Sequence, residues 1–249
     1  MQKQLLFSFS GFIALLLWQK LYEYSCISLF FPLFAGIVIF KSTYEFVVAK
    51  RICLAKCYFE KNSLFYLFFT KKVFLFVFSL FSGIILSLSL FAALVNFNTT
   101  DFILFGGDVF VLVFLYNFLL KKRSLNKNVK YPITKNITSW INATIITFIL
   151  LIIALYQTPP DYIQNDLFET IQLHSKESFS QCEYINPFIV LIKEAEAFKW
   201  WIMLKLSVLD INHYLKIFIW LFFLIGNYLF VFAFGRYILE IGDFERVEI

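Results

Sequence analysis

The sequence lacks the short motifs that identify a reaction. It contains no glycine-rich phosphate-binding loop, no G-x-S-x-G nucleophile turn and no H-E-x-x-H zinc motif. It also has no C-x-x-C pair, which a thiol-redox enzyme usually carries. These absences do not exclude an enzyme, but they leave no positive reason to propose one. We therefore predict no catalytic residue and no cofactor.

Linkers and repeats are missing as well. The chain has no internal repeat, no Gly/Ser-rich linker and no low-complexity tail, which indicates one membrane domain over residues 1–249. The first apolar stretch has no small-x-small cleavage site before the next polar residues. We therefore expect an uncleaved first membrane segment rather than a signal peptide.

What the sequence has in excess is apolar surface. Hydrophobic residues make up 60% of the chain, aromatic residues 21%, and 35 residues are phenylalanine. An ordinary soluble domain is roughly half apolar. Most of the phenylalanines lie in runs without polar alternation, so their surroundings must also be apolar. The composition predicts an all-α, polytopic transmembrane helical bundle, and the lipid bilayer is its first partner.

Apolar runs predict about six spans. The first two runs are short for a bilayer, which needs about 20 residues per helix. They are therefore the first candidates to be tilted, re-entrant or paired as a hairpin. The predicted spans are residues 5–18, 24–40, 73–97, 102–120, 137–157 and 217–237.

The positive charges predict the orientation. Lysine and arginine concentrate in residues 41–72 and 121–136, and the positive-inside rule assigns such connections and both termini to the cytoplasm. The net charge of +5 is thus an orientation signal and not a sign of nucleic-acid binding. Residues 42–62 fit either a basic amphipathic helix on the inner leaflet or an extension of the second span. The richness in Lys, Phe, Ile and Asn suggests an A+T-rich genome, and we expect a bacterial inner membrane.

Residues 158–216 form the longest predicted extracytoplasmic segment. Asn186 and Pro187 resemble a helix start, and an apolar stripe follows them. Trp200 and Trp201 suit the headgroup level of a bilayer, so we predict that they anchor an interfacial amphipathic helix. The alternative is a helix packed on other extramembrane protein.

Asp108 is a carboxylate inside the fourth predicted span. An ionised acid facing lipid is costly, so Asp108 should face protein or water. Ser89 of the third span is expected at a similar depth and could meet it. Three alternatives stay open: a structural polar contact, a proton or cation relay, or a span that begins only at Asp108.

Asn117, Asn142 and Asn227 lie within the fourth, fifth and sixth predicted spans, respectively. Asn117 and Asn142 are both near the predicted cytoplasmic side, where a hydrogen bond between them would be worth about 0.6–1 kcal/mol. Asn227 lies near the middle of the sixth span without an obvious partner. We interpret all three as helix-packing residues first, and Asn227 as a second candidate for a transport path.

The cysteines divide between the two sides of the membrane. Cys26 and Cys182 both fall outside in the predicted topology and could form a disulfide if that compartment is oxidising. His174, Cys182 and His213 match no known metal-site spacing, so no metal site is predicted.

The leading functional hypothesis is a membrane subunit or helper of a larger assembly or transport system, with other membrane proteins as partners. The alternative is a small transporter or channel that uses Asp108, with Asn227 and Ser89 along the path. A membrane thiol-redox protein using Cys26 and Cys182 is a remote third hypothesis.

Overall fold

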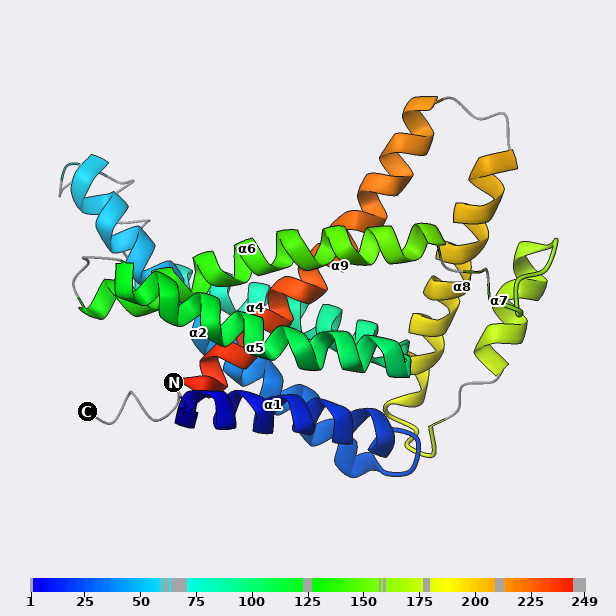
Figure 1. Ribbon diagram of the computed structural model, residues 1–249, viewed down its shortest axis with the longest axis horizontal. Coiled ribbons are helices and arrows are strands. Elements are labelled where there is room, and N and C mark those ends of the chain that lie inside the picture. Colours follow the sequence, from blue (N-terminus) through cyan, green and yellow to red (C-terminus); the bar gives the residue numbers. More distant parts are fainter. Residues whose placement is uncertain are drawn as a thin grey trace.

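The computed structural model describes residues 2–58, 60, 63, 71–122, 127–156, 158, 160–176, 180–208 and 213–243. The elements formed by this part of the chain are helices (Figure 1). They are α1 (Gln2–Leu21), the 3-10 helix η1 (Cys26–Leu29), α2 (Phe30–Tyr58), α4 (Lys72–Val95), α5 (Thr99–Lys122), α6 (Lys127–Tyr156), α7 (Leu167–Lys176), α8 (Asn186–Val208) and α9 (His213–Gly242).

Six of these helices are long and apolar enough to cross a membrane, which confirms the predicted fold class and indicates a multi-pass membrane protein. The candidate spans are Gln2–Leu21, Cys26–Arg51, Lys72–Val95, Thr99–Lys122, Tyr131–Ala154 and Trp220–Gly242.

The first two spans are longer than the sequence predicted. Their helices continue through polar residues at the ends of the apolar runs, and some of these residues are buried and hydrogen-bonded within the protein. Gln4, for example, is only 5% exposed and donates to Asp243. The helix α2 is continuous through Tyr58, so the stretch after Phe40 extends the second span.

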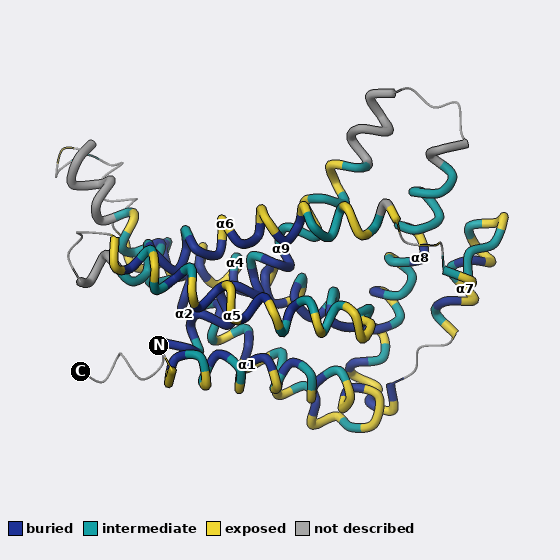
Figure 2. The backbone as a smooth tube through the Cα atoms, viewed as in Figure 1, coloured by how far each residue is buried: buried dark blue, intermediate teal, exposed yellow. Residues whose placement is uncertain are grey.

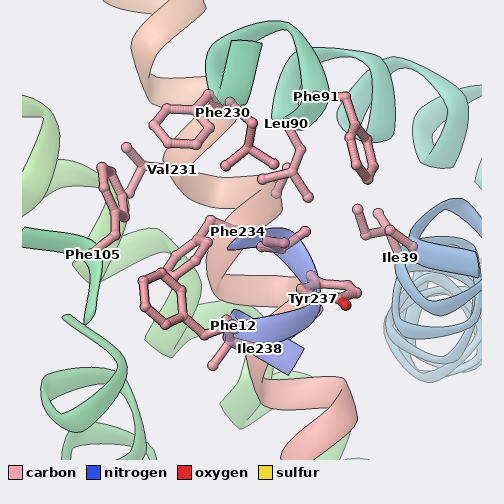
Figure 3. Packing of buried hydrophobic residues seen from close by; sticks show 14 of the residues in the cluster. Phe12, Ile39, Leu90, Phe91, Phe105, Phe230, Val231, Phe234, Tyr237 and Ile238 are labelled. Carbon is pink, nitrogen blue, oxygen red and sulfur yellow. The ribbon is translucent and has the colours of Figure 1, made fainter. Parts of the chain in front are cut away.

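Helix α9 is the central element of the bundle. It crosses the bundle obliquely and packs against α1, α2, α4, α5 and α6 (Figure 1). Its aromatic side chains form the core with those of its neighbours (Figure 3). The ring of Phe105 lies 5.0 Å from those of both Phe230 and Phe234, and Phe12 packs edge-on against Phe234. Burial follows this arrangement, because the buried residues lie along the helix faces that meet α9 (Figure 2).

Small residues allow two of these helix pairs to approach closely, as is common in lipid. A Cβ atom at Gly83 of α4 would lie 3.1 Å from the Phe40 Cα of α2, and one at Gly235 of α9 would lie 3.4 Å from the Ser139 Cα of α6. Gly107 of α5 does not mark such a contact, since a Cβ there would meet nothing within 4 Å.

The outward faces of the spans are apolar. Phe30, Val73 and Ile103 are each more than 70% exposed. Exposed positions recur along the outer side of the helices in Figure 2. A soluble protein rarely leaves so much contiguous apolar surface in water. These faces therefore contact lipid.

The two ends of the bundle differ. One end holds the start of α1, the end of α5 and the end of α9; we call it the terminal end (Figure 1). The opposite end is covered by α7 and α8, and we call it the α8 end. Here Cys26 and Cys182 form a disulfide, and Ser180 donates to the Tyr22 carbonyl at 2.5 Å. These contacts tie the segment before α8 to the turn between α1 and α2.

Candidate functional site

A cavity of about 620 Å³ lies at the α8 end of the bundle. Its walls come from α4, α5, α6, α8 and α9, with α7 at the rim. Its lining residues come from the ends of α4, α5 and α6 that face α8 and from the part of α9 between Phe222 and Phe230. Ligand sites in membrane proteins form in such gaps between helices.

Two of the predicted path residues line this cavity. Ser89 comes from α4 and Asn227 from α9, so side chains far apart in the sequence share one wall. Three phenylalanine rings give the cavity an apolar floor. Phe97 stacks on Phe105 at 5.1 Å, and Phe230 lies 5.4 Å from Phe97.

The acidic side chains of the cavity have polar contacts with neighbouring residues of the protein. Asp101 and Asn98 exchange hydrogen bonds at the start of α5, with distances of 2.9 and 3.0 Å, as in a helix-capping box. Glu196 lies 3.4 Å from the His174 ring nitrogen, and the Tyr162 ring stacks on His174 at 3.8 Å. Burial, followed by the charge of Glu196, raises the pKa of the Tyr162 hydroxyl.

Lys199 differs from these acids. Within the described part of the chain no hydrogen bond or salt bridge reaches its ammonium group, although Glu196 is near enough to act on its charge. Burial lowers the pKa of Lys199, and the charge of Glu196 acts in the opposite direction. Lys199 and Trp200 line both this cavity and a small apolar one between α6, α8 and α9.

Asp108 does not line the cavity. It is 2% exposed and accepts a hydrogen bond of 2.8 Å from the Asn142 amide of α6. Its second oxygen, Oδ1, has no hydrogen-bond partner among the described residues. The geometry is that of a polar contact between helices, while the relay hypothesis stays untested. The expected meeting with Ser89 does not occur, because α4 and α5 each pack on α9 rather than closely on each other.

The predicted pair of Asn117 and Asn142 is wrong. Asn117 donates to Gln4 of α1 and to the Val113 carbonyl, both at 2.8 Å. The reason is that α6 begins at Lys127, well before the predicted start of the fifth span. Asn142 therefore lies roughly four helical turns from the terminal end, about level with Asp108.

A cluster of charges with a buried centre lies at the terminal end. Lys135 of α6 contacts Glu240 of α9 at 2.7 Å and Asp243 at 3.5 Å, while Lys41 of α2 contacts Glu240 at 3.0 Å. Glu45 completes the set at 3.9 Å from Lys135. We call these five residues the ionic cluster. Its ion pairs link the spans formed by α2, α6 and α9.

Neutral donors connect the ionic cluster to two more helices. Asp243 accepts hydrogen bonds from Tyr116 of α5 and from Gln4 of α1. Next to it, the buried guanidinium of Arg236 donates to Asn136 and lies 5.0 Å from the centre of the Phe232 ring. Side chains of α1, α2, α5, α6 and α9 thus meet in this network.

The sequence interpretation missed the ionic cluster. It assigned Lys41, Lys135 and Arg236 to loops or chain ends, as charges that set orientation. The available signal was the position of Glu240, which follows the sixth apolar run at a point where lysines flank two other spans. A count of charges per loop does not reveal which of them become paired.

The remaining predicted residues are placed as follows. Trp201 lies under the Lys205 ammonium at 5.8 Å, but its anchoring role, like that of Trp200, stays a prediction. No group of three or more His, Cys, Asp or Glu side chains in the described residues could hold a metal ion. The side chain of His213 lies outside the described ones.

Comparison of the chain with family models, curated proteins and solved structures gave no match.

Proposed function

We propose that this protein is the membrane component of a transport system and that it binds a small molecule in the cavity at the α8 end. The observation that carries this proposal is the cavity itself. It extends from charged residues on α8 to Ser89 and Asn227, which lie in membrane-spanning helices. Transporters place their binding sites among spans in this way.

The opposite end of the same helix supports the proposal. Asn227 lines the cavity, and Glu240 belongs to the ionic cluster, roughly 20 Å further along α9. One end of the bundle is therefore hollow and the other is closed by paired charges. A transporter that works by alternating access has a state in which its binding site is open to one side of the membrane and closed to the other. The hollow end and the closed end correspond to such a state.

The positive-inside rule gives the orientation that we propose. The terminal end faces the cytoplasm of a bacterial cell and the cavity faces outward. The disulfide at the α8 end supports this orientation, since disulfides persist in oxidising compartments outside the cytoplasm.

Cysteine accessibility tests the proposal without knowledge of the ligand. In a Cys53→Ser, Cys57→Ser background, Ser89→Cys and Asn227→Cys should react with a membrane-impermeant thiol reagent added from outside intact cells. The matched control is Val109→Cys, because Val109 is 0% exposed and does not line the cavity. Failure of both cavity positions to react, with the folded protein present in the membrane, would refute the proposal.

Assembly with a partner subunit is the second candidate function. The observation that favours it is apolar surface on α8, which is not one of the candidate spans: Leu191 and Phe198 are 62% and 44% exposed. Purification in mild detergent tests this candidate. A defined companion protein at fixed stoichiometry supports it, and a monodisperse monomer that retains the labelling pattern argues against it.

A further inference from the structure

The distribution of charge in the cavity indicates the chemical class of its ligand. The carboxylates of Asp101 and Glu196 are occupied by Asn98 and His174, respectively. The ammonium group of Lys199 has no such partner among the described side chains. The two carboxylates already have hydrogen-bond partners within the protein, whereas the lysine has none among the described side chains. The cavity therefore favours an anionic ligand, which can form a charge-assisted hydrogen bond with the lysine.

The rest of the cavity wall favours an apolar group. The rings of Phe97, Phe105 and Phe230 lie within 5.4 Å of one another and line the floor. Phe222 of α9 and Ile153 of α6 also line the cavity, and their side chains are 67% and 40% exposed, so the cavity is open beside them. A molecule with an apolar part can therefore reach the floor between these two helices.

We propose that the cavity takes an amphipathic anion, whose carboxylate or phosphate lies at Lys199 and whose apolar part lies on the floor of Phe97, Phe105 and Phe230. This inference rests on the proposed function, because it assigns the ligand of the same cavity. The anion is either a lipid of the bilayer or a free amphiphile from the aqueous side. Both sources share the chemistry that the cavity recognises.

The position of Lys199 matches the charged end of an amphiphile. Lys199 lies on α8, so its ammonium group approaches the cavity from the α8 end, while the rings of Phe105 and Phe230 come from candidate spans and that of Phe97 from the turn between α4 and α5. This order matches an amphiphile in a bilayer, with its charged group near the surface and its apolar part below. Lys193, which also lines the cavity, adds a second positive charge on the same helix.

Protection of Asn227→Cys from the thiol reagent provides the test, with the protein in phosphatidylcholine nanodiscs. The probes are dodecyl phosphate and dodecanoate, compared with dodecylammonium, inorganic phosphate and acetate. We expect both amphipathic anions to slow the labelling, while the amphipathic cation and the simple anions have little effect.

Two lysine variants then test the role of charge. Lys199→Gln should weaken protection by dodecyl phosphate about tenfold to a hundredfold, as expected for loss of a charge-assisted contact. Lys205→Gln is the matched control, since Lys205 lies six residues further along α8 and lines neither cavity. Unchanged labelling of Asn227→Cys without any probe, together with an unreactive Val109→Cys in the same background, shows that each variant is folded.

The outcomes separate the two proposals. If Asn227→Cys is never labelled, the proposed function fails. If it is labelled but dodecylammonium protects as well as dodecyl phosphate, or Lys199→Gln has no effect, the cavity stands and the anion inference is overturned. Nanodiscs containing phosphatidylglycerol identify the source, because slow labelling without any added probe assigns the anion to the bilayer.

Discussion

Replacing Glu240 with glutamine removes the carboxylate that both Lys41 and Lys135 contact at the terminal end. The Lys135 side chain is only 6% exposed, so its ammonium group cannot compensate by turning into water. Removing one partner of a buried ion pair costs about 3–5 kcal/mol. Asp243 remains 3.5 Å from Lys135, so we expect a loss near the lower end, about 3 kcal/mol.

Glu45→Gln is the matched control for this substitution. Glu45 is 34% exposed and lies 3.9 Å from Lys135, and a pair of this kind contributes about 0–1 kcal/mol. Both variants are compared with the parent by reversible unfolding in mixed detergent micelles. Tryptophan fluorescence follows the transition, because Trp18 is buried in the core.

A second variant examines the cause of the loss. Lys135→Met combined with Glu240→Gln removes the uncompensated ammonium group, so much of the lost stability should return. The reasoning fails if Glu240→Gln is no less stable than Glu45→Gln. It also fails if the double variant loses as much as the two single variants together, since independent sites behave in that way.

Three further predictions concern other contacts of the bundle. Asp108→Asn should leave stability and cavity labelling close to those of the parent, whereas Asp108→Leu should cost about 0.6–1.7 kcal/mol by removing an interhelical hydrogen bond; a strong effect of Asp108→Asn on transport would instead favour the relay. Gly83→Leu should destabilise the protein by about 1–3 kcal/mol through overpacking, while Gly107→Ala should be tolerated, and equal unfolding of the two would contradict this. Reduction of the Cys26–Cys182 bond should expose the segment before α8 to a protease added from outside, and unchanged cleavage would show that the disulfide does not hold this segment.

Hydropathy predicted the spans well for a physical reason. In lipid each spanning segment must satisfy its own backbone hydrogen bonds, so a long apolar run has to be a helix wherever it lies in the bundle. The third predicted span, residues 73–97, for example, corresponds to α4, Lys72–Val95. The polar ends were harder, because hydropathy does not reveal that a polar residue such as Gln4 finds a partner such as Asp243.

Pairing of side chains could not be predicted in the same way. The sequence places Asp108, Ser89 and Asn142 in three different spans, but it does not state which spans are neighbours. Their partners were decided by α9, which packs against both α4 and α5, and by the early start of α6. The early start of α6 places Asn142 level with Asp108, to which it donates a hydrogen bond.

The chain alone determined that this protein consists of apolar helices in contact with lipid, because that outcome depends on the composition of local windows. Only the tertiary structure decided that Lys135 is paired with Glu240 inside the bundle and that Ser89 and Asn227 share a cavity. These relations join residues distant in the sequence, and the oblique course of α9 determines both of them.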